Sequence, residues 1–175
     1  MEQLITENRE SYHYKFFEWS YPIMKKINDE NKLGYDMEYI KNNVRISTSW
    51  AYRSKKGVMG TTMESQGSAK NFTEITISPN YNSDKDYFGT MVHEFTHAIC
   101  FTLNHCGHDK KHFGGLAKLF FLGGNKLTQC GYSIEMWQLF KIDEFMKING
   151  AYKDIHARIM THYKTNDEGN IIDDD

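Results

Sequence analysis

The chain has 175 residues, of which 39% are hydrophobic, and its formal net charge is −2, which fits one domain built around a single core. Because it has no dense basic block, the composition gives no reason to expect strong nonspecific binding to nucleic acid. No run of about 18 apolar residues occurs, and the polar start MEQLITENRESYHYK is unlike a signal peptide, so we expect a cytoplasmic protein without membrane association.

The first half of the chain predicts a helix followed by short strands. Residues 9–31 place apolar side chains near helical spacing, although Pro22 would also allow two short helices. Alternating apolar residues predict strands within 42–53 and 72–79, and the glycines between them indicate a further strand with loose turns. A small antiparallel sheet is the simplest arrangement of these strands.

The second half predicts helices. Ser83 and Asp84 are suitable caps for a helix that runs toward Gly107, and residues 110–122 and 133–148 predict two more helices. The acidic ending NDEGNIIDDD is typical of a disordered tail. We therefore expect one α+β domain over residues 1–164 and a tail over 165–175.

The cysteines indicate no structural framework. Cys100, Cys106 and Cys130 are odd in number and form no CxxC pair. A disulfide scaffold is not expected, and a four-cysteine zinc ribbon is excluded. We interpret all three as ordinary, partly buried thiols.

Residues 93–97 read HEFTH and lie inside the long periodic helix. His93 and His97 are four residues apart, so they project from one face of the helix and both imidazoles can reach one zinc ion. Glu94 would then lie beside the metal without binding it, where its carboxylate can take a proton from zinc-bound water. The motif predicts a zinc site with Glu94 as general base.

A catalytic zinc site also requires a third protein ligand and an open position for water. The metzincin pattern needs a histidine six residues after His97, and that position is Leu103, so this class is excluded. We favour His108, because Gly107 can turn the chain back toward the zinc, and His112 is the next choice. The full set of candidates comprises three histidines and two later glutamates: His105, His108, His112, Glu135 and Glu144.

The order of these motifs resembles the SprT-like zinc metallopeptidases, the family of SprT and Spartan, in its short phage and bacterial forms. In that family the aromatic after the third histidine usually follows four residues later, whereas Phe113 is five residues after His108. Either this chain has one inserted residue between the two positions, or Asp109 stands where the family has its third histidine and another histidine binds the metal instead. The strings that carry the resemblance are ITISP at 75–79, HEFTHA at 93–98, GHDKKHF at 107–113, LAKLFFLGGNKLT at 116–128 and NGAYKDIHARI at 149–159.

The resemblance implies a zincin-like single domain with an N-terminal helix, a small antiparallel sheet, and the HExxH helix followed by further helices. It implies one Zn²⁺ per chain bound by His93, His97 and a histidine after the loop, and Glu94 as the catalytic residue of a zinc metalloendopeptidase acting on a protein or peptide. Spartan-type relatives cleave proteins crosslinked to DNA. DNA is a weaker expectation here, because Arg45, Arg53, Lys55 and Lys56 are few and no added domain accompanies them.

Two other classes of function remain open at this stage. In a structural zinc module without catalysis, the metal would have four protein ligands, so His108 and His112 would both bind. A metal-free domain that binds DNA or protein would hold no zinc. The geometry of the site and the metal content of the purified protein separate these classes.

Overall fold

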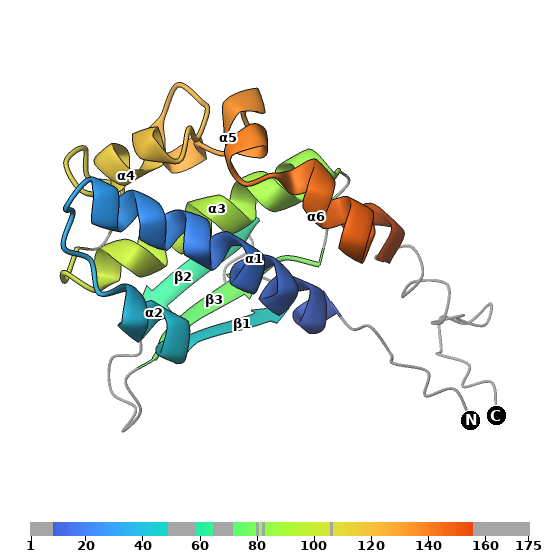
Figure 1. The fold of residues 1–175 in the computed structure, drawn as a ribbon, viewed down its shortest axis with the longest axis horizontal. Coiled ribbons are helices and arrows are strands. Elements are labelled where there is room, and N and C mark those ends of the chain that lie inside the picture. The colour runs from blue at the N-terminus through green and yellow to red at the C-terminus, as the bar shows by residue number, and fades with distance from the viewer. Residues whose placement is uncertain are drawn as a thin grey trace, which may run out of the picture.

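A computed structural model of the chain describes residues 9–48, 59–64, 72–79, 81, 83–105 and 107–155. Two helices come first, three strands follow, and the remaining helices complete the order of elements (Figure 1). This order confirms the α+β class. Several sequence features fall outside the described residues: Trp50 of the first predicted strand, Arg53, Lys55, Lys56, Cys106 and the acidic tail 165–175.

The N-terminal helix α1 (Arg9–Glu30) is continuous, with Pro22 inside it, so the alternative of two short helices is wrong. Its buried face includes Phe16, Phe17 and Met24, and this packing outweighs the backbone hydrogen bond that proline cannot donate. Helix α2 (Met37–Asn43) follows directly.

The sheet is mixed, with strand order β1-β3-β2, and the predicted antiparallel sheet is therefore wrong. β2 (Gly60–Glu64) pairs antiparallel with β3 (Thr73–Ile77), whereas β1 (Val44–Thr48) pairs parallel with β3 on its other side. Alternation of apolar residues indicates which side chains share a face, but it carries no information on strand direction. The further strand expected between the first two is confirmed as β2.

Helix α3 (Asp84–Phe101) lies at the centre of the molecule, between the sheet and the C-terminal helices (Figure 1). Its start is confirmed, because the Ser83 hydroxyl accepts a hydrogen bond from the backbone N–H of Asp86 at 3.1 Å. Most of its residues are buried, and the rings of Phe88 and Phe95 pack against Phe16 of α1. This double-sided burial fixes the orientation of most side chains along α3.

The last helices are α4 (Phe113–Leu119), α5 (Ile134–Leu139) and α6 (Ile142–Asn149), with a 3-10 turn, η1, at Leu127–Gln129. The single helix predicted over 133–148 is wrong, because Lys141 adopts a left-handed backbone with φ of 50° between α5 and α6. None of the helices in the described ranges is both long and apolar enough to cross a membrane.

Candidate metal centre

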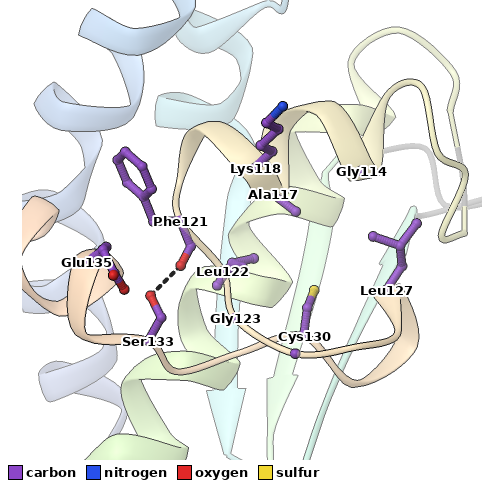
Figure 2. A pocket seen from close by; sticks show the side chains of 11 residues that line it. Gly114, Ala117, Lys118, Phe121, Leu122, Gly123, Leu127, Cys130, Ser133 and Glu135 are labelled. Atoms are coloured by element: carbon purple, nitrogen blue, oxygen red, sulfur yellow. Dashed lines mark hydrogen bonds between the residues drawn. The ribbon is translucent and has the colours of Figure 1, made fainter.

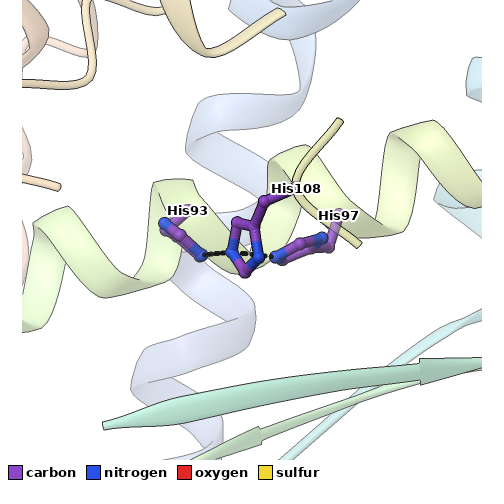
Figure 3. Close-up of side chains that lie close together, drawn as sticks. All are labelled: His93, His97 and His108. Atoms are coloured by element: carbon purple, nitrogen blue, oxygen red, sulfur yellow. Dashed lines mark hydrogen bonds between the residues drawn. The ribbon is translucent and has the colours of Figure 1, made fainter. Parts of the chain in front are cut away.

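Three histidine side chains converge beside α3 (Figure 3). His93 and His97 lie on successive turns of α3, and His108 reaches them from the loop before α4. The Nε2 atom of His108 is 3.1 Å from Nε2 of His93 and 3.1 Å from Nε2 of His97. Gly107 has a φ of 79°, a left-handed conformation that turns the chain back toward α3. The three residues form a group that could hold a metal ion.

Two of the spacings between these nitrogens are close to those expected around a small tetrahedral cation. Zinc–nitrogen bonds of about 2.0–2.1 Å at tetrahedral angles separate two ligand nitrogens by about 3.3 Å. The two separations from His108, both 3.1 Å, are close to that value, and the ligand atoms of all three histidines lie within 4.8 Å of one another. Imidazole is a common ligand of transition-metal ions, so the three side chains could hold such a cation.

The orientation of His93 is fixed by the backbone of a distant segment. Its Nδ1 atom lies 2.7 Å from the carbonyl oxygen of Cys130, and the Cys130 sulfur is 3.3 Å away. A carbonyl oxygen only accepts hydrogen bonds, so the ring proton belongs on Nδ1 and the lone pair on Nε2. Metal-binding histidines usually donate the other ring N–H to an acceptor of this kind. The sequence gives no signal for it, because any residue at 130 has a carbonyl group.

The Cys130 segment reaches α3 because position 89 has no side chain. A Cβ atom on Gly89 would lie 2.5 Å from the backbone nitrogen of Tyr132 and 3.1 Å from the carbonyl carbon of Gly131. Gly89 lies one helical turn before His93, on the same side of α3. The backbone of α3 and the backbone of residues 131–132 therefore approach each other closely, one helical turn from His93, the histidine that Cys130 supports.

Phe113, at the start of α4, forms the wall behind the three imidazoles. Its ring centroid lies 5.0, 4.4 and 4.8 Å from those of His93, His97 and His108. Asp109 accepts hydrogen bonds from the backbone N–H groups of His112 and Phe113, at 2.7 and 3.4 Å. It thus stabilises a turn before α4, whereas we expected a helix that begins at Lys110.

The other candidate ligands lie elsewhere. The rings of His105 and His112 stack on each other, with centroids 3.2 Å apart and planes at 13°. Glu135 lines a neighbouring cavity, and Glu144 lies exposed on α6. Within the described ranges, the group of metal-binding side chains around α3 is limited to His93, His97 and His108.

Burial favours the neutral form of all three imidazoles. Burial lowers the pKa of His93 to about 4, although the hydrogen bond to Cys130 partly opposes it. Burial and the neighbouring rings lower the pKa of His97 to about 3, and burial also lowers that of His108. Neutral imidazoles have free lone pairs, so no proton needs to be displaced before a cation binds.

Glu94 lies on the sheet side of α3, next to strand β2. Its side chain is 5% exposed, and burial raises its pKa to about 7, while a hydrogen bond from Thr62 acts in the opposite direction. The Thr62 hydroxyl donates to Oε2 of Glu94 at 2.6 Å. Thr62 was missed in the sequence, because a threonine in a short strand has no spacing relation to the HExxH motif.

A cavity of about 370 Å³ opens beside the centre, between α4 and the segment before α5 (Figure 2). Ala117, Leu122 and Leu127 provide apolar walls, and Lys118 and Glu135 provide charges. Cys130 belongs to the lining of this cavity and also supports His93. The cavity and the metal centre therefore share one structural segment.

Comparisons of the chain with protein-family models, curated proteins and solved structures find no match.

Proposed function

We propose that this protein is a zincin-like, SprT-like zinc metalloendopeptidase. The observation that carries the proposal is the convergence of three imidazoles beside α3, whose HExxH motif also contains the buried Glu94. His93, His97 and His108 would hold one Zn²⁺. Zinc bound in this way supplies a Lewis acid that polarises a carbonyl group and lowers the pKa of water.

Glu94 would be the general base. Its carboxylate would accept a proton from the water that attacks the peptide carbonyl, and would return it to the leaving amine. A pKa raised to about 7 suits a group that must both accept and return a proton near neutral pH. Burial on the sheet side of α3 keeps the carboxyl away from bulk water.

We propose a protein or peptide as the substrate. The cavity lined by Ala117, Leu122 and Leu127 would accommodate an apolar side chain near the metal centre. A DNA-associated substrate is supported by the resemblance to Spartan alone. Of the four basic residues considered in the sequence, Arg45 lies in the described part of the chain, and its guanidinium lies over the Phe72 ring at 4.9 Å.

The geometry favours an enzyme over a structural zinc module. A structural site would have a fourth protein ligand. His112, the candidate for that role, stacks on His105, and within the described residues no fourth metal-binding side chain joins the triad. A site with three protein ligands would leave a position for water, as catalysis requires.

Replacement of Glu94 by Gln tests the proposal, because it preserves shape and removes the base. We expect the variant to retain one zinc per chain while cleavage of a casein-like substrate falls by about 10²- to 10⁴-fold. Zinc is measured by elemental analysis, and Glu144→Gln on the surface of α6 is the matched control. Cleavage by Glu94→Gln at the parent rate would exclude Glu94 as the base. A fully zinc-loaded parent without peptidase activity would favour the structural module.

A further inference from the structure

We propose that Thr62 is a positioning residue for Glu94, whose carboxyl it holds in a slot on strand β2. The inference rests on the proposed function, because it assigns a role to a residue that supports the general base. It extends the site from α3 to the edge of the sheet, with β2 as a structural part of the centre.

The contact between the two residues is short and direct. The Thr62 Oγ1 atom donates to Oε2 of Glu94 at 2.6 Å, a distance typical of a hydroxyl bound to a carboxylate. Thr62 is anchored in turn, because it lies opposite Ile75 in the antiparallel pair of β2 and β3, and Ile75 is fully buried. The hydroxyl therefore comes from a strand whose position is fixed by the core.

Gly60 completes the slot. It lies two residues before Thr62, so both face the same side of the strand. A Cβ atom on Gly60 would lie 3.0 Å from Cγ and 3.0 Å from Oε1 of Glu94, and 2.9 Å from the Thr90 methyl group. One carboxyl oxygen thus lies over bare backbone while the other is held by a hydroxyl. Together the two positions define where the carboxyl group can lie.

The Thr62 hydroxyl contacts Glu94 at two places. It lies 3.2 Å from the backbone carbonyl oxygen of Glu94, in addition to its contact with Oε2. The hydroxyl is therefore held against both the backbone and the side chain of Glu94, which fixes the position from which it reaches the carboxyl group.

Three threonine variants test the inference in the zinc-loaded protein. Thr62→Val removes the hydroxyl at nearly constant shape, and we expect kcat to fall by about 10- to 100-fold, the effect of losing a hydrogen bond to a charged group. KM and zinc content should stay at the parent values. Thr62→Ser restores the hydroxyl and should recover most of kcat. The matched control is Thr61→Val, the same change on the opposite face of β2, which should leave kcat unchanged.

A parent kcat in Thr62→Val, or a failure of Thr62→Ser to recover it, would overturn the role of Thr62. Gly60→Ala provides a second variant, which retains the hydroxyl but displaces the carboxyl, and it should also lower kcat. An inactive, zinc-loaded parent would instead disprove the proposed function. In that case crystal structures decide the role of Thr62, because an unmoved Glu94 carboxyl in Thr62→Val would contradict it.

Discussion

Two regions of this molecule bury histidine, and they do so in opposite ways. His13 of α1 is fully buried, and both of its ring nitrogens have partners from the protein: Nδ1 lies 2.7 Å from the Tyr87 hydroxyl and Nε2 lies 2.9 Å from the Thr48 hydroxyl. In the metal centre, the Nε2 atoms of His93, His97 and His108 face one another. In the first arrangement both ring nitrogens have protein partners, whereas the second gathers three imidazole nitrogens within 4.8 Å of one another.

The difference shows that the arrangement of partners, and not burial, distinguishes a structural histidine from one that could bind a metal ion. Burial lowers the pKa of His13 to about 3, as it does for His97, so low pKa values are common to both regions. A buried imidazole is stable when both nitrogens have partners. His13 has no spacing relation to the HExxH motif, and its ring lies against the rings of Tyr87 and Tyr152.

The largest expected effect is on zinc binding. His97→Ala should abolish stoichiometric zinc, because two imidazoles hold the ion far more weakly than three. His13→Ala should keep one zinc per chain and instead lower the free energy of unfolding, because it leaves a cavity and two hydroxyls without their partner. Elemental analysis and urea unfolding measure the two quantities. Full zinc occupancy in a His93→Ala, His97→Ala double variant would contradict the proposed centre.

The next effect separates the histidines of the loop. His108→Ala should weaken zinc binding by orders of magnitude, because it removes a nitrogen that faces both helical histidines. His112→Ala should leave affinity nearly unchanged, because its ring stacks on His105 outside the triad. Competition titrations with a zinc chelator measure both affinities. The opposite ranking would show that the loop rearranges on binding and that His112 is the ligand.

The smallest expected effect is the pH dependence of stability that comes from His13, and it tests the structural half of the comparison. Its pKa is about 3 in the folded protein and 6.5 in the reference state, so between these values the unfolded chain binds more protons. The free energy of unfolding should therefore decrease as pH falls below about 6.5, by up to about 1.4 kcal/mol per pH unit for this group. In zinc-free protein, His13→Gln should make this dependence shallower. Equal slopes for parent and variant would contradict a neutral, buried His13.

The features that the sequence predicted are those set by neighbouring residues. The spacing of His93 and His97 fixes their common face, Ser83 caps the helix that carries them, and Gly107 indicated the turn that brings His108 to them. Each depends on local geometry that a single segment contains. The zinc ligation itself and the role of Glu94 stay predictions.

The features that the sequence did not predict depend on distant segments or on the backbone. The direction of β1 follows from its pairing with β3, and no residue type specifies it. Helices α5 and α6 separate at Lys141, where tertiary packing outweighs the low preference of lysine for a left-handed backbone. At this break, the Phe140 carbonyl oxygen accepts a hydrogen bond from the indole N–H of Trp19, at 2.7 Å.

The close contact at Gly89 places an unusual constraint on how this sequence can vary. A single methyl group at position 89 would collide with the backbone of residues 131–132 and push the Cys130 carbonyl oxygen away from His93. Position 89 touches none of the three imidazoles directly, and alanine is otherwise the best residue for a helix. A library randomised at this codon and selected for zinc retention should therefore return glycine, against helix propensity. Selection for metal affinity would then preserve a residue that has no side chain of its own.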